Sequence, residues 1–389
     1  MFTHQSINLN LLRERAHNLR WATVQEGVIP LTAADPDFPV AEPIREAVAK
    51  YARDGYFSYG PNEGLGSFRE SLSKFFIEKR GVNYDPRCIL AVDSAASGIH
   101  LVCKTLLSKG DEAIIFDPVD FLFKHSIETV QAVAIPFQTP PSAAPIDFSE
   151  LEYLITPKTK LICLCNPLNP TGKVFTKKEL YQLALIAEKY NLTILSDEIW
   201  SDIVFSPHEF TSIASLDQSI FNRTITVTGF SKSYGLASVR VGALLIPNID
   251  LYARIFAASM HSSTIRGCNV VGQIAATTAL NECSAWLADF VAHLQNMRDL
   301  SIERIHQIPG FSCQSPQGCY VAWIDIKKTG MCSAKLQTLL LNDARVAVVP
   351  GLNEWFGTGA EGYVRISFAT SAEILNEAFN RIQHSISTL

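Results

Sequence analysis

From about residue 68 onward, short apolar runs alternate with amphipathic segments, and this alternation limits the folds that the chain can adopt. One amphipathic segment opens with Thr176 and Glu179 in the spacing of a capping box, which predicts a helix there. Strands that alternate with helices predict a mostly parallel α/β sheet. The expected strands lie at residues 89–92, 113–116, 133–135, 161–164, 192–195 and 225–227.

Polar residues follow the ends of several of these expected strands. Ser94 and Ser97 follow the first, Asn169 follows the run at 161–164, and Asp197 and Lys232 follow the last two. Parallel α/β sheets bind ligands beyond the carboxyl ends of their strands. The sequence therefore predicts one functional site at this edge of the sheet.

The pattern of expected elements changes after residue 285. A long helix is expected at 286–308, followed by strands at 318–324, 346–349 and 364–368. A chain of 389 residues is long enough for two domains. We predict a large domain at 46–285, a smaller α/β domain at 286–389, and an N-terminal segment at 1–45 that packs on the small domain.

Charge and hydropathy exclude several classes of partner. A net charge of −5 gives no reason to expect binding to nucleic acid or to anionic membranes. No apolar run approaches the roughly 18 residues that span a bilayer, and the N-terminus lacks the pattern of a signal peptide. The nine cysteines are scattered without metal-ligand spacing. We therefore expect a cytoplasmic protein without a metal site.

A single lysine, Lys232, lies in a turn of small polar residues after the expected strand at 225–227. Partial desolvation of such an amine lowers its pKa and makes it nucleophilic toward an aldehyde. The neighbouring hydroxyl and glycine residues can bring donors close to a phosphate. The stretch at 228–235 is thus consistent with a site for pyridoxal phosphate, and a solvated loop lysine is the alternative.

Two further polar residues fit the same cofactor. Asp197 can face the protonated ring nitrogen and keep the ring an electron sink, although a helix cap or a surface salt bridge would also explain a carboxylate there. Asn169 can donate to the phenolate oxygen, although a turn rich in Asn, Pro and Gly would explain it equally well.

Four motifs in this order resemble those of the class I/II aminotransferases, which belong to the fold type I pyridoxal-phosphate superfamily. They are Asn-Pro-Leu-Asn-Pro-Thr-Gly at 166–172, Asp-Glu-Ile-Trp at 197–200, Ser-Lys-Ser-Tyr-Gly-Leu at 231–236 with Arg240, and Arg-Ile-Ser-Phe at 365–368. The resemblance covers nearly the whole chain. It implies a large domain with a mostly parallel seven-stranded sheet, a smaller α/β C-terminal domain, and a homodimer with shared active sites.

The resemblance also implies roles for single residues. Lys232 would hold the cofactor covalently and move a proton between Cα and C4′, and Asp197 would hold the ring nitrogen. Arg365 would bind the substrate carboxylate, a bidentate task that suits guanidinium, although a salt-bridged strand arginine is the alternative. The residues expected at the phosphate are Ala95, Ala96, Ser97, Ser231 and Arg240, with Tyr59 reaching the phosphate of the neighbouring subunit. Those expected around the ring O3′ and the substrate are Asn169 and Ala34.

Three positions depart from the pattern of the family. Trp200 replaces a tyrosine, and its indole N–H can only donate. Asp120 stands where an aromatic side chain usually stacks on the cofactor ring, so either Phe121 or Phe123 takes over the stacking or a carboxylate faces the ring. Ala34 replaces a glycine, and the sequence around it resembles the cystathionine β-lyase-like branch of the superfamily.

The leading hypothesis is an aminotransferase that moves an amino group from an L-amino acid to a 2-oxo acid. The alternative is a C–S β-lyase that releases pyruvate and ammonia, and a remote one is a non-catalytic regulatory protein of the same fold. The sequence does not name the substrate. Arg266 could meet an acidic substrate side chain or lie in a dimer contact, and Asp120 could favour a basic or hydroxylated substrate.

Overall fold

The computed structural model describes residues 1–17 and 19–388, and its centre is a seven-stranded sheet in the order β2-β8-β7-β6-β5-β3-β4. Only β8 runs antiparallel to its neighbours, so the prediction of a mostly parallel sheet is confirmed. The strands are β2 (Ile89–Val92), β3 (Glu112–Asp117), β4 (Val133–Gln138), β5 (Thr159–Cys165), β6 (Thr193–Asp197), β7 (Thr224–Gly229) and β8 (Gly242–Leu245).

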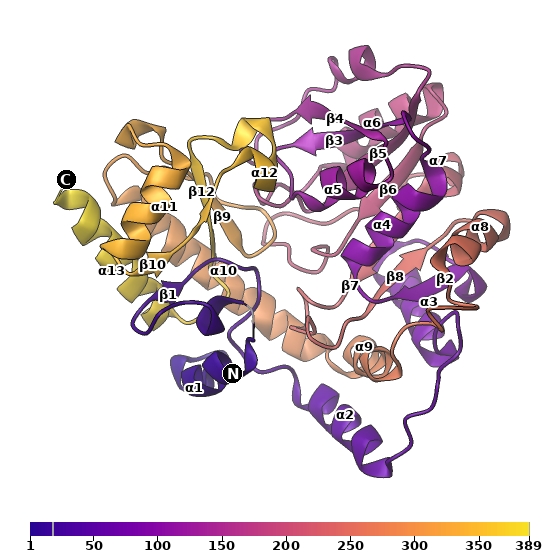
Figure 1. The fold of residues 1–389 in the computed structure, drawn as a ribbon, viewed down its shortest axis with the longest axis horizontal. Coiled ribbons are helices and arrows are strands. Elements are labelled where there is room, and N and C mark those ends of the chain that lie inside the picture. The colour runs from indigo at the N-terminus through magenta and orange to yellow at the C-terminus, as the bar shows by residue number, and fades with distance from the viewer. Residues whose placement is uncertain (18, 389) are drawn as a thin grey trace.

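Six of these strands coincide with the predicted runs, and β8 was not predicted individually. β5 and β7 are apolar or β-branched along most of their length and buried at nearly every position, as expected for strands covered on both faces. Helices lie on both sides of the sheet (Figure 1). The helices of this region are α2 (Glu42–Asp54), α3 (Gly66–Arg80), α4 (Ala95–Leu106), α5 (Leu122–Thr129), α6 (Lys177–Lys189), α7 (Gln218–Arg223), α8 (Ile249–Ser259) and α9 (Val270–Glu282).

The helix starts follow capping rules that are readable in the sequence. The Thr176 hydroxyl accepts from the Glu179 backbone N–H at 3.2 Å, and the Glu179 carboxylate accepts from the Thr176 N–H at 2.8 Å, which confirms the capping box of α6. Ser94 and Ser97 form the same arrangement at the start of α4. That box fixes the N-terminus of α4 directly beyond the end of β2.

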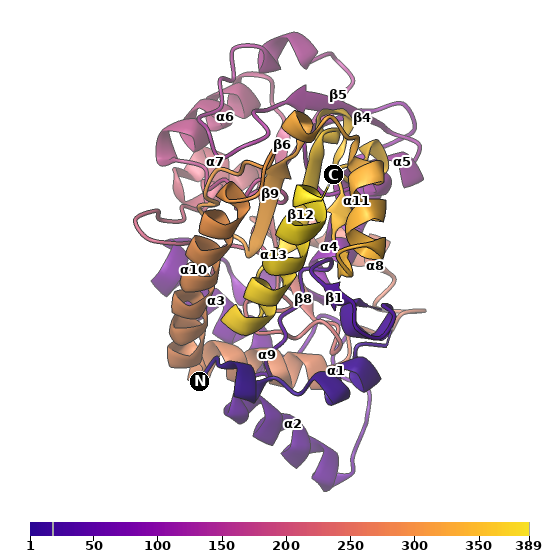
Figure 2. The same cartoon turned by 90° about the vertical axis from the view of Figure 1, so that its left-hand side faces the viewer.

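The C-terminal third contains a three-stranded sheet, β11-β12-β9, covered by helices. Its longest helix, α10, packs beside α13, and both lie against this sheet (Figure 2). The strands are β9 (Val321–Asp325), β10 (Val346–Ala347), β11 (Val349–Pro350) and β12 (Tyr363–Ser367), and the helices are α10 (Ser284–His306), α11 (Ser333–Asn342), α12 (Asn353–Phe356) and α13 (Ala372–Ser387).

The prediction of a single strand at 346–349 was wrong. β10 pairs with β1 (Ile29–Pro30), whereas β11 pairs with β12, so the chain leaves one sheet and enters another at Val348. Alternation of apolar residues cannot reveal such a change, because both short strands are buried by different partners.

The N-terminal segment, which also contains α1 (Leu9–Arg15), is tied to the C-terminal third by the parallel pairing of β1 with β10. Inside the segment, Asp37 accepts from the Arg20 guanidinium at 3.0 Å and from the Trp21 indole at 2.8 Å. All three side chains are buried, so this pairing holds the loop at 31–39 over the sheet. The domain boundaries at 45 and 285 stay predictions, although α10 begins beside the second of them. Within the described residues, none of the helices is long and apolar enough to cross a membrane.

Candidate active site

A cavity of about 280 Å³ lies where the carboxyl ends of β2, β5, β6 and β7 meet. It brings together most of the residues that the sequence singled out. Its walls contain Ala34, Ala95, Ala96, Asp120, Asn169, Asp197, Trp200, Ser231, Lys232, Arg240 and Arg365, together with Ala33, Ser94, Ile99, Leu122, Phe123, Cys165 and Ile199.

Lys232 follows β7 and extends into this cavity. Its Nζ donates to the Ala34 carbonyl at 2.7 Å and lies 5.3 Å from the centre of the Trp200 ring. Burial lowers the pKa of the Lys232 amine, and the nearby Asp35 carboxylate opposes that effect. A lowered pKa increases the neutral fraction of the amine, which is the form that attacks an aldehyde or accepts a proton.

Asp197 ends β6 and is buried in the cavity wall. Burial raises the pKa of its carboxyl to about 7, while the Ile199 N–H, which donates to it at 3.1 Å, pulls the pKa down. A carboxylate that is desolvated to this degree is stabilised by a cation in the cavity.

One end of the cavity, which could hold an anion, is built from the N-terminus of α4 and from Arg240. The backbone N–H groups of the first turn point out of the helix at the positive end of its dipole. Arg240 has a left-handed backbone with φ of 50°, and the Asn269 side chain holds its carbonyl at 2.8 Å. Close packing of Gly242 completes this end, because a Cβ there would lie 2.9 Å from the Ala95 nitrogen.

At the opposite wall, Arg365, Asn169 and Asp120 form a hydrogen-bonded chain. The Arg365 Nη1 donates to the Asn169 Oδ1 at 3.0 Å, and the Asn169 Nδ2 donates to the Asp120 Oδ2 at 2.9 Å. Asp120 Oδ2 lies 4.0 Å from Arg365 Nη1. Burial raises the pKa of Asp120, and Arg365 is the main group that opposes this. Burial also lowers the pKa of Arg365.

Several predicted site residues lie elsewhere. Phe121 does not line the cavity; its ring packs edge-on against Trp355, with centroids 5.3 Å apart, because the turn before α5 directs it outward. The Ser97 side chain and N–H are used in the capping box with Ser94. Tyr59 is 89% exposed and lines a separate surface hollow together with Arg266, so neither reaches the cavity of its own chain.

Part of the cavity wall was not predicted from the sequence. Leu122 and Ile99 contribute apolar surface to it. Tyr320 supports the site from behind: its hydroxyl donates to the same Ala34 carbonyl at 3.1 Å, and its ring packs edge-on against Trp200. Only the folding of the C-terminal third onto the sheet brings Tyr320 there.

The cavity fits pyridoxal phosphate on three observations of its own chemistry. A lysine with a lowered pKa can take the aldehyde, and the buried carboxylate of Asp197 can take the ring N–H. The α4 N-terminus with Arg240 can take a phosphate. These three groups match the three polar ends of that cofactor.

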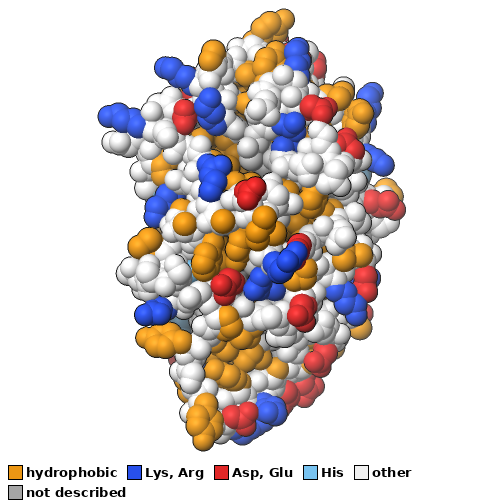
Figure 3. Space-filling view, turned by 90° about the vertical axis from the view of Figure 1, so that its right-hand side faces the viewer, with side chains coloured by type: hydrophobic (Ala, Val, Ile, Leu, Met, Phe, Trp, Pro, Cys, Tyr) orange, Lys and Arg blue, Asp and Glu red, His pale blue; other side chains and the backbone are white. Residues whose placement is uncertain are grey.

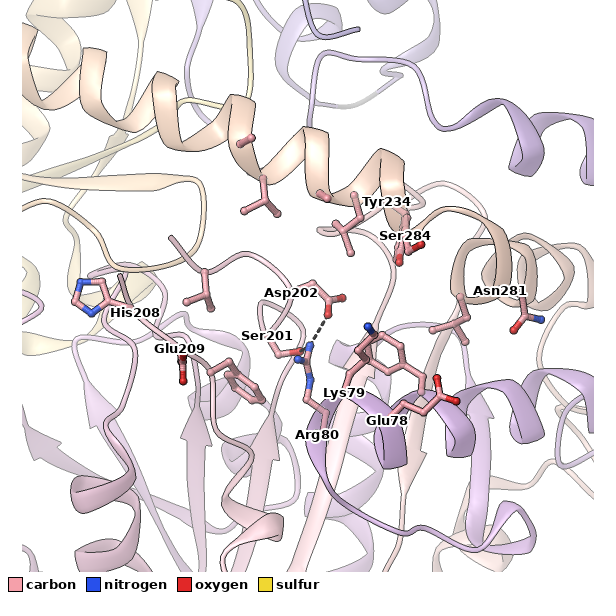
Figure 4. A pocket seen from close by; sticks show the side chains of 18 of the residues that line it. Glu78, Lys79, Arg80, Ser201, Asp202, His208, Glu209, Tyr234, Asn281 and Ser284 are labelled. Atoms are coloured by element: carbon pink, nitrogen blue, oxygen red, sulfur yellow. Dashed lines mark hydrogen bonds and ion pairs between the residues drawn. The ribbon is translucent and has the colours of Figure 1, made fainter. Parts of the chain in front are cut away.

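A larger groove of about 880 Å³ lies behind the site, between α3, α10 and the loop at 201–210 (Figure 4). In it Arg80 pairs with Asp202 and also donates to the Ser201 hydroxyl at 3.2 Å. Asp202 accepts from the Ser233 hydroxyl at 2.8 Å. Because Ser233 follows Lys232 directly, this network holds the lysine turn from outside the cavity.

The model of the family described as aminotransferase class I and II matches residues 26–382. The chain is 33% identical to aromatic-amino-acid aminotransferase 2 of Thermococcus litoralis, covering 92% of this chain and 91% of that protein. It is 31% identical to the aspartate aminotransferase of Pyrococcus horikoshii, covering 94% and 92%.

Two solved structures have the same fold as this chain. The aromatic aminotransferase from Pyrococcus horikoshii superposes with a TM-score of 0.87 at 30% identity, covering 94% of this chain and 97% of that one. Cystalysin from Treponema denticola, whose structure contains a pyridoxal 5′-phosphate cofactor, superposes with a TM-score of 0.91 at 23% identity, covering 100% and 99%. The fold is therefore common to an aminotransferase and to cystalysin.

Proposed function

The chain belongs to the aminotransferase class I and II family, and from that premise we propose that it is a pyridoxal-phosphate-dependent aminotransferase. The reaction moves an amino group from an L-amino acid to a 2-oxo acid. The observation that carries the proposal is the convergence of Lys232, Asp197 and Arg365 on one cavity. The pKa shifts of the first two suit the amine and the carboxylate that this chemistry requires.

When bound, pyridoxal phosphate withdraws electrons from the Cα atom of the amino acid that is attached to it. Asp197 sustains that withdrawal by holding the ring nitrogen in its protonated state. Ser231, Arg240 and the N-terminus of α4 hold the phosphate and fix the ring.

The amine of Lys232 is the group placed to move a proton. In its neutral form it removes the Cα proton. The Ala34 carbonyl accepts from the Lys232 amine at 2.7 Å, so it can hold the amine whenever that amine is free of the cofactor. Arg365 orients the amino acid through its carboxylate, and Thr32 helps to fix the guanidinium by accepting a hydrogen bond from it at 3.3 Å.

We also propose that the enzyme is a cytoplasmic homodimer whose partner completes the site with Tyr59. The loop at 55–65 carries exposed Tyr56, Phe57 and Tyr59, and Ile265 lies in the same exposed region. Hydrophobic side chains gather in patches on the side of the molecule that carries this loop (Figure 3). Exposed apolar patches of this kind favour a contact with a second protein surface.

Visible absorption of the protein loaded with pyridoxal phosphate tests the proposed function. We expect wild-type protein to show the visible band of a lysine-bound cofactor, and Lys232→Ala to lose it. Lys178→Ala is the matched control, because Lys178 is exposed on α6 and should keep the band. An amino acid should bleach the band, and a 2-oxo acid should restore it. A band that persists in Lys232→Ala contradicts the proposal.

A β-elimination is the second candidate, because the loop at 31–39 presents Ala33-Ala34-Asp35, a stretch that resembles the cystathionine β-lyase-like branch of the superfamily. The same absorption experiment separates the two reactions. Release of ammonia and pyruvate, with no lasting loss of the visible band, identifies elimination instead of transamination.

A further inference from the structure

Asp120 is the one charged side chain of the cavity wall that the proposed function leaves without a partner. Five charged side chains line the cavity: Asp120, Asp197, Lys232, Arg240 and Arg365. The cofactor provides partners for three of them through its ring nitrogen, its aldehyde and its phosphate. The substrate carboxylate provides the partner for Arg365.

The contacts of Asp120 show what changes when a substrate arrives. Its carboxylate now faces Arg365 at 4.0 Å and accepts from Asn169 at 2.9 Å and from the Leu122 N–H at 3.4 Å. A substrate carboxylate bound to Arg365 takes over the cation that acts most strongly on Asp120. Lys232, the other cation near Asp120, is engaged by the cofactor in the proposed function. Asp120 is then a desolvated carboxylate beside a second carboxylate, with only neutral donors.

A cation on the substrate itself would give the Asp120 carboxylate the positively charged partner that it then lacks. We propose that Asp120 selects amino acids whose side chain carries a second positive charge, that is, diamino or guanidino acids. This inference rests on the proposed function and deepens it by naming the class of donor. The side-chain cation pairs with Asp120 while the α-carboxylate pairs with Arg365. Because Asp120 lies so close to Arg365, the two ends of one small molecule can reach both.

The surroundings of Asp120 agree with this donor class. Leu122, Phe123 and Ile99 supply apolar surface in the same cavity, against which the methylene groups of a diamino acid can pack. The side chain of Asp120 is 22% exposed, so its carboxylate is open to the cavity and not sealed beneath it. Arg266, which could have met an acidic substrate, lies in the separate hollow with Tyr59.

Binding of unreactive analogues tests the proposal without relying on turnover. An α-methyl amino acid has no Cα proton, so it can bind the cofactor-loaded protein but cannot complete the reaction. We would compare α-methylornithine with α-methylnorvaline, which has the same chain length without the terminal ammonium, by titration calorimetry. We expect α-methylornithine to bind at least about tenfold more tightly than α-methylnorvaline, because α-methylnorvaline lacks the ammonium that pairs with the desolvated carboxylate of Asp120.

Asp120→Asn should bring the ratio of the two dissociation constants close to one, without weakening the neutral analogue. Glu209→Gln is the matched control, because it removes one exposed carboxylate outside the cavity and should keep the wild-type ratio. The inference is overturned if the ratio of the two dissociation constants is the same in Asp120→Asn as in wild type. It is also overturned if wild type binds the neutral analogue more tightly than the ornithine analogue. Equal binding of both analogues to wild type also overturns the inference, but it leaves the aminotransferase proposal standing. Failure of both to bind overturns the two proposals together.

Discussion

Gly242 is a position where one added methyl group tests how the sheet and the cofactor site are coupled. In Gly242→Ala the new Cβ would lie 2.8 Å from the Thr228 oxygen, 2.9 Å from the Ala95 nitrogen and 2.9 Å from the Ser94 carbonyl carbon. All three are backbone atoms, so no flexible side chain can move away. The methyl group must therefore push the N-terminus of α4 away from β7 and β8.

The size of the effect follows from overpacking, which costs about 1–3 kcal/mol for an added methylene in a tightly packed region. If α4 moves, the strain appears as weaker cofactor binding, by about 5- to 150-fold, because about 1.4 kcal/mol corresponds to a factor of ten. If α4 does not move, the free energy of unfolding falls by a similar amount. The two quantities are measured by titration of the cofactor-free protein with pyridoxal phosphate and by urea unfolding.

Gly66→Ala is the control for this experiment. Gly66 is the first residue of α3, and a Cβ there meets no atom within 4 Å. Alanine is also the better helix former, so the control should keep the affinity of wild type and should not lower its stability. If Gly242→Ala matches this control in both quantities, the argument that close packing at Gly242 shapes the phosphate end is refuted.

Two further predictions concern the carboxylates around the lysine turn. Burial raises the folded-state pKa of Asp197 from 3.8 to about 7, so the folded protein without cofactor binds this proton more tightly than the unfolded chain does. The resulting contribution to stability is fully present below pH 3.8 and is lost as the pH rises through 7. Asp197→Asn should therefore flatten the fall of the melting temperature between about pH 4 and 7, and Glu198, whose pKa is also raised to about 7, should still contribute its part. An unchanged slope would contradict this. Asp202→Asn removes the ion pair with Arg80 and weakens the hydrogen bond from Ser233, and should lower the free energy of unfolding by about 1–3 kcal/mol in urea titrations. A loss smaller than about 0.3 kcal/mol would show that this network does not hold the turn.

Local sequence patterns predict six of the seven strands of the large sheet and the polar residues at their ends. Continuous apolar runs such as β5 are buried in any arrangement, so their burial pattern is local information. Lys232 and Asp197 follow strands that run parallel, and parallel strands present their carboxyl ends at one edge. For that reason their meeting in one cavity was predictable before the fold was known.

The packing of the C-terminal third on the large sheet selects the side chains that complete the cavity. Arg365 belongs to β12 in a different sheet, and its distance to Asn169 depends on how the C-terminal third sits against the large sheet. Asp120 faces that arginine while Phe121 turns outward to Trp355, a choice made by the turn before α5 and not by residue type. Contacts between residues far apart in sequence follow from packing of whole elements, and no local pattern carries that information.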